Sequence, residues 1–158
     1  RFFHQYGIAD FLIYTGIDLT EANIYNAKKM FPDIDFREGN ALEINAEDKE
    51  YDYVLVSDLF EHLSLHGLET AAKEICRVTA SKLIINFFSM GDALDHKVNP
   101  IRNYHWNLLS CSKTKQLFEN WCKVTDIIWI REFQKKTFGY SDYYNQHSHT
   151  FFLEKKIV

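Results

Sequence analysis

Strand-like and helix-like segments alternate along this chain of 158 residues, and their order limits the fold more than any other feature. Short apolar runs typical of buried strands are followed by stretches whose apolar residues recur every three or four positions. The clearest strands are expected at residues 51–57 and 82–88, with a helix between them that carries Leu68, Ala72 and Ile75 on one face. The alternation predicts an α/β fold with a mostly parallel sheet and helices on both faces.

Shorter elements flank this central part. The other expected strands are residues 13–18, 34–37, 124–133 and 150–155, and the other expected helices are residues 2–12, a helix capped by Thr20, and one whose face carries Thr114, Leu117, Phe118 and Trp121. No helical pattern separates the last two strands, so we expect them to form an antiparallel pair at one edge of the sheet. The chain contains no repeat or proline-rich linker, which predicts a single domain over residues 1–158.

A fold of this order should begin with a strand before the first helix, and no such strand is present. The chain starts at Arg1 rather than at a methionine and runs at once into an apolar segment. Its six glycines make up a smaller share of the chain than the average of about 7%. We therefore expect the domain to be N-terminally incomplete, with the first of seven strands missing.

The composition argues against several kinds of partner. Acidic residues outnumber basic ones by 22 to 18, so nucleic-acid binding is not expected. No apolar run approaches the roughly 18 to 20 residues that a membrane span needs. The three cysteines show no C-x-x-C spacing, and no histidine pair has metal-ligand spacing beside a carboxylate. We expect reduced thiols, a cytoplasmic protein and no metal, while the oligomeric state stays open.

Polar residues at the ends of the predicted strands are the first candidates for a binding site, because ligands of open α/β sheets bind beyond the carboxyl ends of the strands. Asp18 ends the first strand and is suited to accept both hydroxyls of a ribose, or else to cap the following helix. Residues 39–41 end the second strand, where the Asn40 side chain would accept from an adenine amino group or form an ordinary turn.

The third candidate segment follows the strand at residues 51–57. It brings Ser57, Asp58, Glu61 and His62 close together in sequence. Histidine titrates near neutral pH, so His62 is a candidate base. The alternative is that this segment only begins a helix and that His62 is packed or solvated.

Four segments appear in a fixed order: YTGIDLTEANI, FREGNALEI, YDYVLVSDLFEHLS and ICRVTASKLIINFF. Together they resemble the class I S-adenosylmethionine (SAM)-dependent methyltransferases, and among these the methyltransferase-domain group related to the ubiquinone-biosynthesis enzymes. That family has an acid before an S/T-x-x-x-I/L helix, as in Asp18, Thr20 and Ile24. A G-D-A triplet matches residues 39–41, and an E-H-L/I triplet matches residues 61–63. The resemblance implies a Rossmann-like sheet and SAM as cofactor.

The resemblance also implies binding roles. Asp18 would hold the ribose hydroxyls, Leu19 would pack on one face of the adenine, and Asn40 and Ala41 would meet the adenine edge. The methionine part of the cofactor, or its transferred methyl group, would lie near two further residues, Ser57 and Asp58. His62 would face the substrate or be structural.

This chain departs from the family pattern in three places. The family's glycine-rich loop after the first strand is absent, and its place would be just before Arg1. We expect that the loop precedes Arg1, and the alternative is a degenerate member of the family that lacks it. Asn40 replaces the family's Asp, which keeps an acceptor. Residues 77–81 lack the Pro and Gly pair of the family's R-V-L-K-P-G-G phrase.

Two long segments are expected to select the methyl acceptor as lid loops, residues 89–111 and 134–148. The first carries Tyr104, His105 and Trp106, and such a mixture of aromatic and polar groups suits a small organic molecule. The alternative is an aromatic surface or a contact between copies of the chain.

The leading hypothesis is a methyltransferase acting on a small molecule by in-line displacement, with catalysis by positioning and desolvation and with a base where the acceptor must lose a proton. The second is a non-catalytic methyltransferase-like module that binds a partner. The third is an NAD(P)-dependent oxidoreductase. Asp18, which would follow the second strand of a complete fold, also suits the ribose of NAD.

Overall fold

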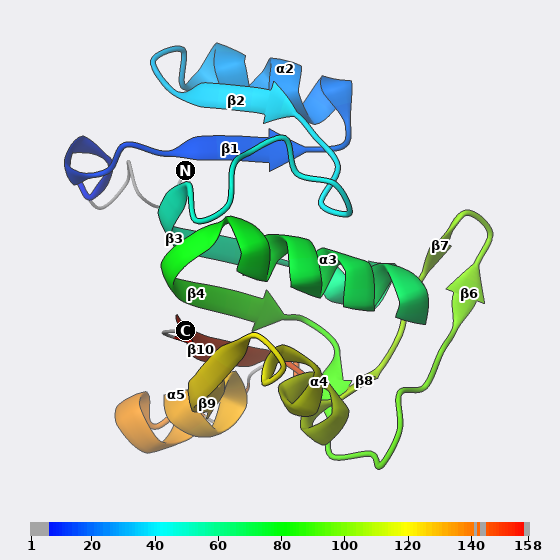
Figure 1. The fold of residues 1–158 in the computed structure, drawn as a ribbon. Helices are drawn as coiled ribbons and strands as arrows, with labels where there is room; N and C mark the ends of the chain where they lie inside the picture. The colour runs from blue at the N-terminus through cyan, green and yellow to red at the C-terminus, as the bar shows by residue number, and fades with distance from the viewer. Residues whose placement is uncertain (1–6, 141, 143–144, 157–158) are drawn as a thin grey trace. The chain divides into compact units, whose positions relative to one another are not determined.

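The computed structural model describes residues 7–140, 142 and 145–156. The chain divides into two compact units, residues 1–45 and 46–158. In the described residues, the first unit contains a two-stranded parallel sheet with one α-helix, and the second contains a four-stranded mixed sheet. The elements of each unit can be followed in Figure 1. This is an α/β structure, as the alternation predicts, although a single seven-stranded, mostly parallel sheet is not confirmed.

In the first unit, β1 (Thr15–Asp18) pairs in parallel with β2 (Asp35–Glu38), and α2 (Glu21–Met30) connects the two strands. The close approach of the strands depends on Gly16. A Cβ at this position would lie 2.6 Å from the ring of Phe36, so the aromatic ring packs directly over the glycine. The parallel register places Asp18 opposite Glu38, so the carboxyl ends of both strands meet at one edge.

The helix expected at residues 2–12 is not present in the described part of that range, which begins at Gly7. Only a 3-10 turn, η1 (Ala9–Phe11), is found there, and residues 2–6 lie outside the described residues. The reason is local: Gly7 has a φ of +67°, which a right-handed helix does not allow.

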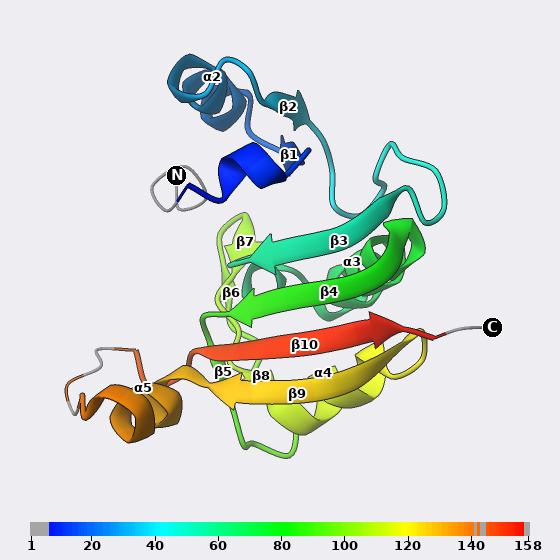
Figure 2. The same cartoon turned by 90° about the vertical axis from the view of Figure 1, so that its left-hand side faces the viewer.

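The second unit is built on four strands in the order β3 (Tyr51–Ser57), β4 (Thr79–Phe87), β10 (His149–Lys155) and β9 (Cys122–Trp129), which lie side by side in Figure 2. β3 and β4 are parallel, while β10 is antiparallel to both of its neighbours. The predicted antiparallel pairing of the last two strands is therefore present. This pair lies at one edge of the sheet, as expected, with β9 as the outermost strand and β10 between β9 and β4.

Two helices, α3 (Leu65–Val78) and α4 (Cys111–Phe118), lie on the same face of this sheet (Figure 2). Side chains of β4 alternate between that face and the opposite one. Leu83, Ile85 and Phe87 are buried, while Ile84 is 36% exposed. Burial of this apolar face is the main favourable contribution to the stability of the unit.

The strand expected at residues 124–133 ends earlier, because a helix follows it. β9 stops at Trp129, and α5 (Ile130–Phe138) then runs into the segment expected to be a loop, 134–148. Gly139 ends the helix with a φ of +73°, a common helix-terminating conformation. The strand prediction for residues 130–133 was wrong because bulky residues typical of strands, such as Ile130 and Phe133, begin this helix. Residues 141, 143 and 144 of the expected loop lie outside the described residues.

The segment at residues 89–111 is irregular, as expected, and contains four strands of two residues each: β5 (Met90–Gly91), β6 (Pro100–Ile101), β7 (Tyr104–His105) and β8 (Leu109–Ser110). β6 and β7 form an antiparallel hairpin. It lies at the carboxyl ends of β3 and β4 (Figure 1), next to η2 (Phe60–His62), the 3-10 turn that follows β3. None of the described helices is long and apolar enough to cross a membrane.

Candidate functional site

The first group of candidate residues lies at the carboxyl ends of β1 and β2. The carboxylate of Asp18 accepts hydrogen bonds from the Thr20 amide at 2.7 Å and from the Asn23 side chain at 3.2 Å. Thr20 stands at the N-cap position, as predicted, but its own side chain makes no capping bond. The Asp18 carboxylate therefore holds the first turn of α2 and stays partly exposed at the strand end.

The turn after β2 lies beside Asp18. The Gly39 amide donates to the main-chain oxygen of Asp18 at 3.0 Å, which ties the two strand ends together. The Asn40 side-chain oxygen accepts from the Leu42 amide at 2.9 Å, so Asn40 forms a local turn. The structure thus brings together Asp18 and Asn40, and Leu19 next to them is 69% exposed.

A hollow of about 410 Å³ runs between β1, β2 and α2 in the same unit. Asp18 and Asn23 contribute polar groups to its wall. The lining is otherwise mainly apolar and is formed by Gly16, Ile17, Ile24, Asn26, Ala27, Met30, Phe31 and Phe36.

The second group of candidate residues lies at the carboxyl ends of β3 and β4. Asp58 has a φ of +54°, which is uncommon for a residue other than glycine and turns the chain sharply after β3. Its amide donates to the main-chain oxygen of Asn86 at 3.2 Å. Ser57 precedes it and is exposed.

His62 lies at the centre of this group. Its Nδ1 is 3.1 Å from the main-chain oxygen of His105, and its Nε2 is 3.4 Å from Oδ1 of Asp58. The ring packs against Trp106 and Tyr104, with ring centroids 5.1 and 6.1 Å away. The carbonyl can only accept, so Nδ1 carries a proton, and in the neutral ring Nε2 holds the lone pair. The Nδ1 bond therefore orients the ring, and Nε2 gains an ion pair with Asp58 when it takes up a proton.

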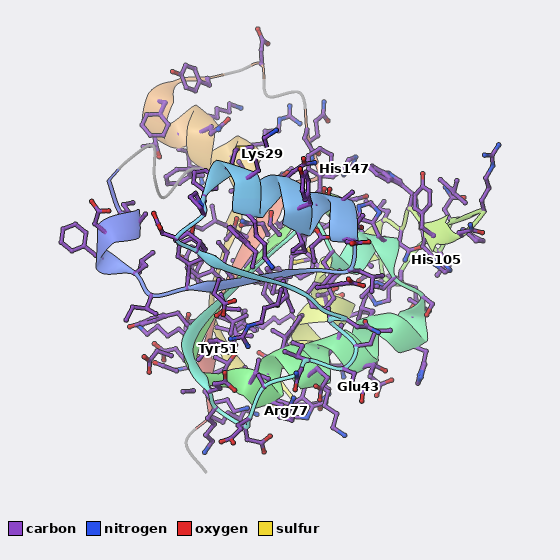
Figure 3. All side chains as sticks on the ribbon, turned by 90° about the horizontal axis from the view of Figure 1, so that it is seen from above. Lys29, Glu43, Tyr51, Arg77, His105 and His147 are labelled. Atoms are coloured by element: carbon purple, nitrogen blue, oxygen red, sulfur yellow. The ribbon has the colours of Figure 1, made fainter. Side chains whose placement is uncertain are left out.

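The hairpin residues predicted to face an acceptor do reach His62. Tyr104 and Trp106 are 47% and 42% exposed, so each ring offers area beyond its contact with His62. His105, labelled on the hairpin in Figure 3, provides its main-chain oxygen. We call Asp58, His62, Tyr104 and Trp106 the aromatic cluster.

Two residues behind the aromatic cluster are fully buried and polar. Oε1 of Glu61 accepts from the amides of Phe88 and Ser89 at 2.5 and 3.2 Å, and its Oε2 has no partner among the described residues. Burial raises the pKa of Glu61, against the opposing effect of the Phe88 amide. Asn107, the second residue, lies 0% exposed at the base of the hairpin.

Glu61 is among the polar residues that the sequence predicts after β3, whereas the sequence gives no reason to expect Asn107 at this site. Nothing in the local sequence distinguishes Asn107 from the exposed Asn103 four positions earlier. The distinction arises only when the hairpin folds back onto η2. No group of three or more histidine, cysteine, aspartate or glutamate side chains that could hold a metal ion is found among residues 7–140, 142 and 145–156.

Comparisons with known proteins give the context of these two groups. The family model of a methyltransferase domain matches residues 5–82, just under half of the chain, and this range includes Asp18, Asn40 and His62. The search of curated proteins found no match.

Solved structures match nearly the whole chain. A 1,6-didemethyltoxoflavin-N1-methyltransferase from Burkholderia thailandensis, solved with 1,6-didemethyltoxoflavin and S-adenosylhomocysteine, matches with 12% identity and a TM-score of 0.72 over 98% of this chain. A SAM-dependent methyltransferase from Methanosarcina mazei matches with 11% identity and a TM-score of 0.70 over 91% of it. The PH0226 protein from Pyrococcus horikoshii matches with 18% identity and a TM-score of 0.69 over 97% of it.

The chain spans 66%, 82% and 76% of these three proteins, respectively. At such low identities the similarity concerns the fold. The protein therefore has the fold of the SAM-dependent methyltransferases, and its first half carries the methyltransferase-domain sequence pattern.

Proposed function

We propose that this protein is a SAM-dependent methyltransferase that transfers a methyl group to a small-molecule acceptor. The observation that carries the proposal is the match of residues 5–82 to a methyltransferase domain, because that range contains the first group of candidate residues and, of the second group, Ser57, Asp58 and His62. The fold shared with methyltransferases supports it. A fold alone hosts many functions, so the proposal depends on the residues at the strand ends.

The residues of the first unit fit the adenosine part of SAM. Each oxygen of the Asp18 carboxylate accepts one hydrogen bond from α2, which leaves further lone pairs for two ribose hydroxyls. The exposed Leu19 side chain offers an apolar surface for the adenine, and Asn40 with Ala41 would meet its edge. Ser57 and Asp58 would lie near the methionine part.

The aromatic cluster fits the acceptor. SAM supplies a methyl group on a positively charged sulfur, and the protein's part is to orient the acceptor and receive its proton where one must be lost. Nε2 of His62 is the nitrogen suited to take that proton, because the Asp58 carboxylate 3.4 Å away would stabilise the imidazolium, while the Nδ1 bond orients the ring. Tyr104, His105 and Trp106 would contact the acceptor. The small organic molecule named in the Burkholderia structure supports an acceptor of this size.

Within the methyltransferases, the sequence resemblance favours the group related to ubiquinone-biosynthesis enzymes. Three further predictions also come from the sequence alone. They are a glycine-rich loop before residue 1, a lid role for residues 89–111 and 134–148, and a cytoplasmic location.

The test is formation of S-adenosylhomocysteine from SAM by the purified protein in the presence of pooled small-molecule fractions, measured by mass spectrometry. The account expects product with at least one fraction, and loss of product in Asp18→Ala. A folded protein that forms no product and does not bind SAM would favour the non-catalytic module. Binding of NADH in place of SAM would favour the oxidoreductase.

A further inference from the structure

The buried polar residues behind the aromatic cluster connect three segments that are far apart in sequence. Asn107 is 46 positions from Glu61, yet its amide donates to the main-chain oxygen of Glu61 at 2.9 Å. Its side-chain Nδ2 donates to the main-chain oxygen of Leu63 at 2.8 Å. Both neighbours of His62 along the chain are therefore held by one residue.

The same side chain also holds the base of the hairpin. Oδ1 of Asn107 accepts from the Asn99 amide at 3.1 Å, and the Asn99 carbonyl accepts from the Trp106 amide at 2.8 Å. The asparagine amide thus donates to the turn after β3 and accepts from the hairpin. Asn107 is fully buried, so removal of its side chain leaves the Leu63 carbonyl and the Asn99 amide without this partner in the interior.

Glu61 fixes the turn from the other side. Its Oε1 accepts from the two amides that directly follow β4, Phe88 and Ser89. The turn that carries His62 is consequently tied to the end of β4 by Glu61 and to the hairpin by Asn107. Neither side chain reaches the solvent, so neither is available to touch a substrate.

We propose that Asn107 and Glu61 are positioning residues that set the hairpin, residues 99–107, against the ring of His62. Of the two, Asn107 is the decisive one, because its side chain bonds both segments that form the aromatic cluster. Without it, the His62–His105 bond and the stacking of Trp106 on His62 lose their support. The binding of the acceptor by this cluster rests on the proposed function. The positioning of the hairpin against His62 is independent of that function.

The experiment compares wild type with Asn107→Ala and with Asn103→Ala, a matched control on the exposed tip of the same hairpin. Amide hydrogen exchange is measured at Trp106 and in β4, and ¹⁵N NMR reports the protonated nitrogen of neutral His62. In Asn107→Ala we expect exchange at Trp106 to accelerate by about tenfold with β4 unchanged. We also expect His62 to lose its preference for a proton on Nδ1. Asn103→Ala should change neither.

A second variant keeps the volume of the side chain. Asn107→Asp loses the donor to Leu63 while it is ionised and regains an O–H donor when it is protonated. Exchange at Trp106, corrected for intrinsic rates, should be fast at neutral pH and return toward the wild-type rate at acidic pH.

Wild-type exchange and an unchanged His62 proton position in folded Asn107→Ala would overturn the proposal. If that variant does not fold, the absence of acid recovery in Asn107→Asp would overturn it. SAM titration of wild type separates this result from the proposed function. Failure to bind SAM removes the methyltransferase assignment, whereas the exchange data test only the positioning.

Discussion

Nδ1 of His62 donates a hydrogen bond to the main-chain oxygen of His105, 3.1 Å away and 43 positions further along the chain. This bond joins the turn after β3 to the β6–β7 hairpin. It also fixes which nitrogen of the neutral ring holds the lone pair. The orientation of His62 is thus a property of the tertiary structure and not of the local sequence.

Replacement of His62 tests this relationship. We expect His62→Ala to lower the free energy of unfolding by about 1–2 kcal/mol, because one hydrogen bond and two aromatic contacts are lost. SAM affinity should stay unchanged, since the account places His62 on the acceptor side. Urea unfolding and calorimetry measure the two quantities, with the exposed His66→Ala as control. A marked loss of SAM affinity would instead assign His62 to the cofactor site.

Replacement of Asp18 tests the proposed ribose contact. The amide oxygen of Asn can still accept from the Thr20 amide, so Asp18→Asn should fold with little loss of stability. It should weaken SAM binding by about tenfold or more, because a charged acceptor of the ribose hydroxyls is lost. The exposed Asp33→Asn is the matched control in calorimetry. Equal affinities of the two variants would mean that Asp18 only caps α2.

The secondary structure was largely predictable where one pattern dominated. The strand at residues 51–57 matches β3, because Val, Leu and Tyr run there between polar segments. The helix with Leu68, Ala72 and Ile75 on one face matches α3. α5 was missed, because residues with high strand propensity begin it and only tertiary context decides between the two structures.

The candidate site was predictable only in its strand-end residues. Asp18 and Asn40 stand at the ends of two strands, so their positions in the sequence were enough to predict that they lie near each other. The proximity of His62 to Trp106 depends on a hairpin 40 residues downstream, and the role of Asn107 depends on burial that no local pattern shows. Long-range contacts of irregular segments carry no periodic signal in the sequence.

The buried carboxyl of Glu61 predicts a specific dependence of stability on pH. Burial raises its pKa in the folded state above the ordinary value of 4.5. Between the two values the native state binds more protons than the unfolded state, so this group makes stability fall as the pH rises from about 4.5 through the folded pKa.

Glu61→Gln removes that contribution, since glutamine does not titrate. Urea unfolding of wild type and Glu61→Gln from pH 4.5 upward should show wild type losing stability relative to the variant. The exposed Glu69→Gln should run parallel to wild type. If wild type instead gained stability relative to Glu61→Gln as the pH rises over this range, the pKa of Glu61 would not be raised by folding.

The core of the second unit predicts a large effect of truncation at Phe87. Its ring is 1% exposed and lies 5.6 and 4.9 Å from the rings of Phe60 and Phe151. Phe87→Ala should lower the free energy of unfolding by about 3–5 kcal/mol through lost transfer energy and the cavity left behind. Tyr53→Ala, at a side chain that is 70% exposed, should cost far less in the same chemical denaturation. Equal losses would show that β4 does not form the core.

The central claim is that this domain binds SAM, and calorimetric titration of SAM into the protein tests it most directly. The account predicts one binding site per chain with a Kd on the order of micromolar, weakened in Asp18→Asn. No heat of binding, from protein whose circular dichroism shows the fold intact, would contradict the methyltransferase assignment and favour a non-catalytic module of the same fold.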